Sequence, residues 1–220
     1  MNMKLLAASL AATLLSACVS ILPEAPPAPY IYTMRVGAVE PSTAPAHPLV
    51  IIIGAPSAQR MTAGSDIVWR QGAEIAVMDR AAWDDAAPDL LQTMLTETLS
   101  RRGVFRAAVR GGAGARGDID LRWDVLAFEV VEDGGLEAVF STTVRLVDAR
   151  SRTIIDTRRF DTRAPIANRS AREAVAALER AAREACLQIT EWAAEKAPAP
   201  LPPPVVSGAP SQPSAASIRR

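Results

Sequence analysis

The sequence predicts an α+β fold, with a mixed, largely antiparallel β-sheet and two main α-helices packed on one of its faces. The first observation is the order of the elements: strand-like runs, a helix, further strand-like runs and a long final helix. The second is periodicity, because apolar residues recur at every second position in some runs and every three or four positions in others. The third is composition, since 49% apolar and 22% charged residues are typical of a globular domain with a buried core.

Both helices carry sequence signals at their ends. The first is predicted to begin around Asp85–Asp89, where Pro88 suits the first turn and acidic residues suit the positive end of the helix dipole. It is predicted to end at Gly103, after two arginines. The second begins after Ser170, which forms a capping-box pattern with Glu173. The faces expected to be buried are Leu90, Leu91, Met94, Leu95 and Leu99 in the first helix, and Val175, Leu178, Ala182, Ala185, Ile189 and Trp192 in the second.

Eight strand-like runs surround these helices. Those before the first helix are residues 31–36, 49–53, 67–70 and 74–78, and those after it are residues 104–110, 118–131, 136–147 and 153–160. Gln71-Gly72-Ala73 predicts a hairpin turn between the third and fourth runs. Short connections at Asp133-Gly134-Gly135 and at residues 148–151 predict that the last three runs form an antiparallel meander.

The N-terminus has the pattern of a secretion signal. Lys4 supplies a positive charge, and Leu5–Leu15 is an apolar run of eleven residues, too short to cross a bilayer core of about 30 Å as a helix. Leu15-Ser16-Ala17-Cys18 then resembles the bacterial lipobox. This motif predicts signal cleavage between Ala17 and Cys18, and attachment of diacylglyceryl and N-acyl groups such as palmitate at Cys18. The alternative is an ordinary signal peptide followed by a chance cysteine.

The chain divides into four predicted segments. Residues 1–17 are the lipoprotein signal peptide, residues 18–29 the lipidated cysteine and a Pro-rich linker, residues 30–196 the folded domain, and residues 197–220 a disordered Pro-rich tail. In polyproline geometry the linker reaches roughly 34 Å, so the domain can stand clear of a membrane. Val19 stands where bacterial lipoproteins kept in the inner membrane usually have Asp. By this resemblance the protein is expected at the outer membrane of a Gram-negative bacterium, lipid-anchored and facing the periplasm.

The composition argues against several function classes. Basic and acidic residues balance, 24 against 24, whereas a nucleic-acid-binding protein needs a basic surplus. A single histidine, His47, and two cysteines argue against His/Cys metal sites and against His-dependent catalytic triads. Asp118 and Asp120 have no further donors nearby in the sequence, so a solvated strand end is expected there and not a cation site. We therefore expect no catalytic residues, no metal and no cofactor, and a protein that is not an enzyme.

Three further features have ordinary structural explanations. Gly112-Ala-Gly114-Ala-Arg-Gly117 matches the dinucleotide-binding fingerprint in letters, but a strand follows where a helix is required, so a flexible loop is predicted. Cys186 has no partner if Cys18 is lipidated, and its place on the last helix predicts a small buried residue. A basic segment is either an exposed rim or a contact for phospholipid headgroups or an acidic partner. It comprises Arg158, Arg159, Arg163, Arg169 and Arg172.

Four short motifs, taken with the lipobox and the linker, resemble a known family. They are Tyr30-Ile-Tyr32-Thr-Met34, Ile53-Gly-Ala-Pro56, Asp66-Ile67-Val68-Trp69-Arg70 and Met78-Asp79-Arg80-Ala-Ala-Trp83. Together they resemble the ABC-type transport auxiliary lipoproteins, the PqiC/YmbA-like family, from about Tyr30 to Trp192. That family often reads Tyr-Tyr-Thr-Leu where this chain has Tyr32-Thr33-Met34 after Ile31. Its Arg-Trp pair before the first helix is here Ala82-Trp83.

The resemblance implies a role in binding. Family members accompany an ABC ATPase, a permease and an MCE-type periplasmic protein that move lipids between membranes. These proteins and the outer membrane are therefore the expected partners, and self-association into a homo-oligomer stays open. Tyr32, Trp69 and Trp83 are then interaction residues, although packing at the sheet–helix junction is the favoured explanation for the two tryptophans. The alternative function is a lipoprotein regulator of peptidoglycan or envelope assembly.

Overall fold

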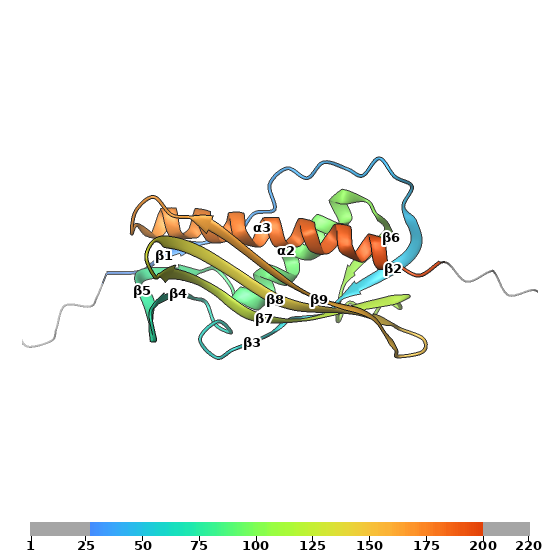
Figure 1. Ribbon diagram of the computed structural model, residues 1–220, viewed down its shortest axis with the longest axis horizontal. Coiled ribbons are helices and arrows are strands. Elements are labelled where there is room, and N and C mark those ends of the chain that lie inside the picture. The colour runs from blue at the N-terminus through green and yellow to red at the C-terminus, as the bar shows by residue number, and fades with distance from the viewer. Residues whose placement is uncertain (1–26, 200–220) are drawn as a thin grey trace, which may run out of the picture.

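The computed structural model describes residues 27–199, which form one twisted sheet with two helices on the same face (Figure 1). The helices are α2 (Ala87–Arg102) and α3 (Ala171–Lys196). The strands are β1 (Tyr30–Tyr32), β2 (His47–Ile53), β3 (Ser57–Ala58), β4 (Asp66–Gln71), β5 (Glu74–Trp83), β6 (Phe105–Arg110), β7 (Ile119–Glu132), β8 (Leu136–Asp148) and β9 (Ile154–Pro165). The predicted α+β class, with a mixed and mostly antiparallel sheet, is confirmed.

The long strand β7 organises the sheet. One of its edges pairs antiparallel with β8 along almost its whole length, and β8 pairs in turn with β9. Along the other edge three shorter strands run parallel to β7 in succession: β2 at Ile119–Leu121, β3 at Asp124–Val125 and β4 at Glu129–Val131. The sheet then continues from β4 to β5 and β1, and from β2 to β6.

A β-bulge at Leu126 changes which side chains of β7 face the core. Before it, the buried residues occupy odd positions, from Ile119 to Val125, as period two requires. The pairing with β8 shifts between Val125 and Ala127, and the inward residues become Phe128 and Val130. Leu126 is the extra residue and remains partly exposed. The bulge therefore allows a strand of 14 residues to keep one face buried while it bends around the helices.

The helices begin and end where their sequence signals place them. Gly103 adopts the left-handed conformation at the end of α2, and its N–H donates to the carbonyl of Leu99. At the start of α3, the Ser170 hydroxyl accepts from the Glu173 N–H at 3.3 Å. The reciprocal half of the capping box is supplied by Asn168, whose side-chain oxygen accepts from the Ser170 N–H.

The predicted apolar faces of both helices pack into one core with the sheet. In α2 every predicted residue is buried except Leu90, which is partly buried, and in α3 all six are buried. Cys186 also lies in this core as a free thiol, and burial raises its pKa to about 12. A thiol with that pKa is almost entirely protonated at neutral pH, so its role is packing.

Several strand boundaries differ from the sequence prediction. The first strand was expected over residues 31–36, but β1 ends at Tyr32, where its carbonyl accepts from the N–H of Asp84 just beyond β5. Conversely, β5 continues beyond Met78 to Trp83, and β9 continues beyond Phe160 to Pro165, because each has a partner strand along that length. The two-residue strand β3 has no period-two signal and was not predicted.

The fold requires Gly117 to lie close to β2. A Cβ at this position would collide with the Ile52 side chain, whereas a Cβ at Gly135 would meet nothing within 4 Å. Gly117→Ala should therefore lower the free energy of unfolding by about 1–3 kcal/mol, through overpacking. Gly135→Ala is the matched control and should change it by less than about 0.5 kcal/mol. Urea unfolding measures both, and adding Ile52→Ala should recover part of the loss in the first variant. Equal effects at the two glycines would contradict this packing.

Candidate functional site

The three aromatic residues expected at a site come together at the end of the sheet formed by β1, β5 and β4. Tyr32 pairs with Trp83 in the parallel register of β1 and β5, and Trp69 pairs with Ala76 across β4 and β5. The Trp83 N–H donates to the carbonyl of Ser65 at 2.7 Å, which closes this end of the sheet. Cys18 and the predicted cleavage site after Ala17 lie outside the described residues.

Trp83 is a core residue. Its side chain is 3% exposed, and its ring stacks on Phe128 with 5.7 Å between the ring centroids. Phe128 in turn contacts the Phe140 ring edge-on at 5.8 Å. Trp69 and Tyr32 are only partly buried and pack against the margin of the same core. Of the three residues, Tyr32 and Trp69 therefore reach the surface, and Trp83 does not.

An exposed apolar surface lies at the same end of the sheet. It consists of Tyr30, Ile31, Ile75 and Val77, whose exposed fractions are 67%, 59%, 51% and 47%, and we call it the edge surface. β1 is the outermost strand and covers only Ala81–Trp83 of β5, so within the described residues the outer edge of β5 before Ala81 carries no partner strand (Figure 1). Exposed apolar side chains beside unpaired backbone groups favour the addition of another chain.

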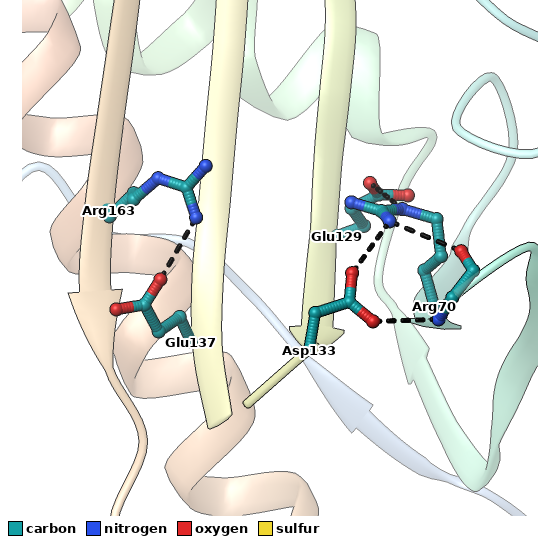
Figure 2. A network of polar contacts seen from close by, with 6 residues as sticks. Arg70, Glu129, Asp133, Glu137 and Arg163 are labelled. Carbon is teal, nitrogen blue, oxygen red and sulfur yellow. Dashed lines mark hydrogen bonds and ion pairs between the residues drawn. The ribbon is translucent and has the colours of Figure 1, made fainter. Parts of the chain in front are cut away.

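A network of ion pairs holds the β4–β5 hairpin against the central strands. Figure 2 shows Arg70 of β4 between Glu129 and Asp133, with its Nε 2.8 Å from Glu129 and its Nη1 3.2 Å from Asp133. The other carboxylate oxygen of Asp133 accepts from the Gly72 N–H in the hairpin turn. The hydrogen bond to Glu129 raises the pKa of Arg70 further above its usual value. The hairpin that carries Ile75 and Val77 is therefore firmly positioned.

The basic segment is mostly neutralised by neighbouring carboxylates. Arg163 pairs with Glu137 at 3.0 Å, as Figure 2 also shows, Arg159 pairs with Asp161, and Arg169 pairs with Glu132. Arg158 lies over the Phe160 ring, 5.3 Å from its centroid. Arg172 is exposed near the start of α3. This arrangement favours the exposed rim over a phosphate-binding surface for the segment.

The remaining motifs lie where the sequence analysis placed them. Gly112 and Gly114 adopt positive φ angles in the loop between β6 and β7, and no helix opens there. The carboxylate of Asp118 accepts from the Val50 N–H at 2.8 Å.

In the part of the chain that the structure describes, no three His, Cys, Asp or Glu residues are grouped to hold a metal ion. Within that part, no helix is long and apolar enough to cross a membrane.

The edge surface could not be found from the sequence. Glu74–Met78 is an apolar run after a turn, and such a run predicts a buried strand. Only the structure shows that the hairpin extends past the helices, so that Ile75 and Val77 have no core to contact. The nearby Tyr30-Ile-Tyr32 motif did point to this end of the sheet.

Two tryptophan variants test whether the buried Trp83 contributes more to stability than the half-buried Trp69. Trp83→Ala should lower the free energy of unfolding by about 3–5 kcal/mol, because it leaves a cavity beside Phe128. Trp69→Ala, at the half-buried position, should cost about 1 kcal/mol. Chemical denaturation monitored by circular dichroism measures both. A larger loss in the Trp69 variant would show that this residue, and not Trp83, anchors the end of the sheet.

Two solved structures share this fold, and a third is less similar. A crystal structure of a protein from Xanthomonas campestris aligns with a TM-score of 0.70 and 23% identity, over 76% of this chain and 96% of that chain. An uncharacterized protein aligns with a TM-score of 0.60 and 16% identity, over 76% of this chain and 99% of that one. A PelC dodecamer from Paraburkholderia phytofirmans has a TM-score of 0.45 and 13% identity, over 69% and 89% of the two chains. No match was found among curated proteins.

The family comparison covers most of the domain. Residues 32–190 match the model of the ABC-type transport auxiliary lipoprotein component. The match begins at Tyr32, the last residue of β1, and ends within α3, so it includes β2 to β9, all of α2 and most of α3. The chain thus belongs to the family of ABC-type transport auxiliary lipoproteins, as the four sequence motifs predicted.

Proposed function

We propose that this protein is the outer-membrane auxiliary lipoprotein of an MCE-type ABC transporter that moves phospholipids between membranes. It acts by docking a periplasmic partner, and not by catalysis. Family membership supports the association with an ABC transporter. The lipobox at Cys18 and the following Val19 support a lipid anchor in the outer membrane. The observation that carries the docking role is the edge surface, a set of exposed apolar side chains on β1 and along an edge of β5 that is unpaired within the described residues.

The chemistry of the edge surface indicates what kind of segment binds there. Exposed acidic residues lie within or just after β5, beside these apolar side chains in the sequence, namely Glu74, Asp79, Asp84 and Asp85, and Arg80 is paired with Asp79. An added strand therefore needs apolar side chains for the edge surface and basic residues beside them. We assign this strand to the MCE-type periplasmic protein. A second copy of this chain would bring another acidic rim against the first, which makes it the less favourable occupant.

The position of the edge surface also suits this role. The described chain begins at residue 27, at the same end of the molecule as β1 and β5 (Figure 1). From Cys18 to Tyr30 the chain spans at most about 40 Å when fully extended. A lipid at Cys18 would therefore keep the edge surface within that distance of the membrane, where a partner crossing the periplasm arrives.

The anchor itself has a direct test. Cys18→Ser removes the thiol that accepts the diacylglyceryl group, so the protein should lose palmitate labelling and appear in the soluble periplasmic fraction. Metabolic labelling and membrane fractionation measure the two effects. Cys186→Ser is the matched control, because this cysteine is buried in α3 and should leave labelling unchanged. Labelling that persists in the Cys18 variant would refute the lipobox assignment.

The docking role is tested by photo-crosslinking in cells. A photoreactive amino acid at Ile75 should capture the MCE-type protein, whereas the same group at Ile154, also an exposed isoleucine, should not. Val77→Glu should weaken the crosslink and sensitise cells to detergents. Deleting the partner as well should add no further sensitivity.

Three results would contradict the docking role. Equal capture at Ile154 would show that contact is not specific to the edge surface. Capture of this chain alone would assign the edge surface to self-association. Capture of peptidoglycan synthases, together with additive detergent phenotypes, would favour the envelope-assembly alternative.

A further inference from the structure

A polar cleft of about 980 Å³ lies at the end of the domain opposite to β1 and β5. Its lining residues come from the start of β2, from β6, from the loop between β6 and β7, from the turn between β8 and β9, and from the residues that follow α3. Figure 1 shows these elements at that end of the ribbon. Four arginines and three aspartates line it: Arg106, Arg116, Arg150, Arg152, Asp118, Asp120 and Asp148. None of these residues takes part in the edge surface.

The carboxylates of the cleft are already engaged by the protein. Asp148 accepts from the N–H and hydroxyl groups of Ser151 and from the N–H of Arg150, and the Ser151 N–H above all holds the pKa of Asp148 below its usual value. Asp118 accepts from the Val50 N–H. Asp120 lies 3.5 Å from Arg122, which is not a lining residue. All the bonds to the Asp148 carboxylate reach its Oδ1, and those to Asp118 and Asp120 reach their Oδ2, so each carboxylate is held by groups other than the guanidinium groups of Arg116, Arg150 and Arg152.

The arginines, in contrast, have few partners. Arg106 is 3.9 Å from Asp118, at the limit of an ion pair. Within residues 27–199, no carboxylate lies within 4.0 Å of the guanidinium groups of Arg116, Arg150 or Arg152. Each guanidinium presents several N–H donors in a planar fork that suits phosphate oxygens. The cleft therefore brings together guanidinium N–H donors that have no carboxylate partner in the described part of the chain, whereas most arginines of the basic segment are paired with carboxylates.

The backbone holds the walls of the cleft together. The Asp118 N–H donates to the Val50 carbonyl at 2.8 Å, and the Ala149 N–H donates to the Asp118 carbonyl at 3.0 Å. These two bonds connect β2, the loop before β7 and the turn after β8. Gly117 permits the close approach of that loop to β2. The arginines of the loop and of the turn are thus carried by one connected frame.

Arg152 provides an independent sign of function. Its φ is 63°, in the left-handed region that favours glycine, and its N–H donates to the Asp148 carbonyl to close the turn. Glycine would close the same turn with less strain. Residues strained in this way cluster at functional sites, and Arg152 is the one that lies in this cleft, whereas Arg80, which also has a positive φ, lies on β5.

We propose that this cleft binds a phosphate-bearing anion through Arg116, Arg150 and Arg152. The volume exceeds that of a phosphate ion and accommodates a phospholipid headgroup or a similar phosphate ester. The few apolar lining residues, Pro48, Leu49, Ala149, Pro198 and Ala199, are too few and too small to enclose an acyl chain, so any lipid chains remain outside. The proposal rests on the geometry of the cleft and does not depend on the transporter partner.

The key variant is Arg152→Gly, which removes a guanidinium and relieves the backbone at the same position. Titration of the purified protein with sn-glycerol 3-phosphate at constant ionic strength, followed by NMR, should show saturable shifts confined to the cleft. Arg152→Gly should weaken this binding about tenfold, the loss expected for a charge-assisted hydrogen bond. Its melting temperature should stay equal or rise. Arg172→Gln, which removes an exposed arginine near the start of α3, is the matched control and should bind normally.

Inorganic phosphate and lipid vesicles serve as two further probes, which distinguish free phosphate from a phospholipid headgroup as the ligand. Equal affinity for inorganic phosphate and the ester would assign the site to free phosphate. Tighter binding of the ester, with stronger cosedimentation on vesicles containing phosphatidylglycerol than on pure phosphatidylcholine, would assign it to headgroups. Either result supports the cleft as a phosphate site. Shifts spread over all surface arginines, or an equal loss of affinity in Arg152→Gly and Arg172→Gln, would overturn the proposal.

Discussion

The pairing of β7 is the constraint on which the rest of the structure depends. This strand is hydrogen-bonded to four others, to β8 on one edge and to β2, β3 and β4 in succession on the other. Its two halves can both face the helices only because the bulge at Leu126 shifts the inward positions by one residue. Without that shift, Phe128 would point to solvent, and Trp83 would lose the ring against which it stacks. The end of the sheet that carries the edge surface therefore depends on one extra residue in the middle of β7.

Local signals in the sequence predicted the helices and turns well. Gly103 and Ser170 mark helix ends through backbone chemistry that acts within a few residues, and the structure has both ends where these signals place them. The strand order could not be predicted in the same way. The parallel pairings of β2, β3 and β4 with β7 join residues about 60 positions apart, and period two reports which face is buried but not which strand is adjacent. Even the length of β5 is set by its neighbours β4 and β1.

In the candidate sites, too, local sequence signals indicate a region, and long-range packing decides the role of each residue. The three aromatic residues lie at the same end of the sheet as the edge surface, but burial separates Trp83 from Tyr32 and Trp69, and burial depends on long-range packing. The sequence left two interpretations of the basic segment around Arg163, an exposed rim or a contact for phospholipid headgroups or an acidic partner. In the structure most of its arginines meet carboxylates on neighbouring strands. The arginines of the cleft that lack carboxylate partners within the described residues come from a loop and a turn, and only the fold brings them together with Arg106 of β6.

The two surfaces lie at opposite ends of an elongated domain, and this separation bears on how the protein would work at a membrane. The helix α3 has 26 residues and spans about 39 Å, which is close to the roughly 34 Å that the proposed linker would reach if it were in polyproline geometry. A tether of this length does not by itself determine whether the domain stands upright or lies along the membrane. Orientation would then be decided by binding energy. Headgroups in the arginine cleft would lay the domain flat, and a strand added at the edge surface would turn that end toward the partner. The two sites use different elements, so one does not block the other directly. Both can be occupied together if the anion comes from a source other than the anchoring membrane, or if the partner approaches along the surface of that membrane.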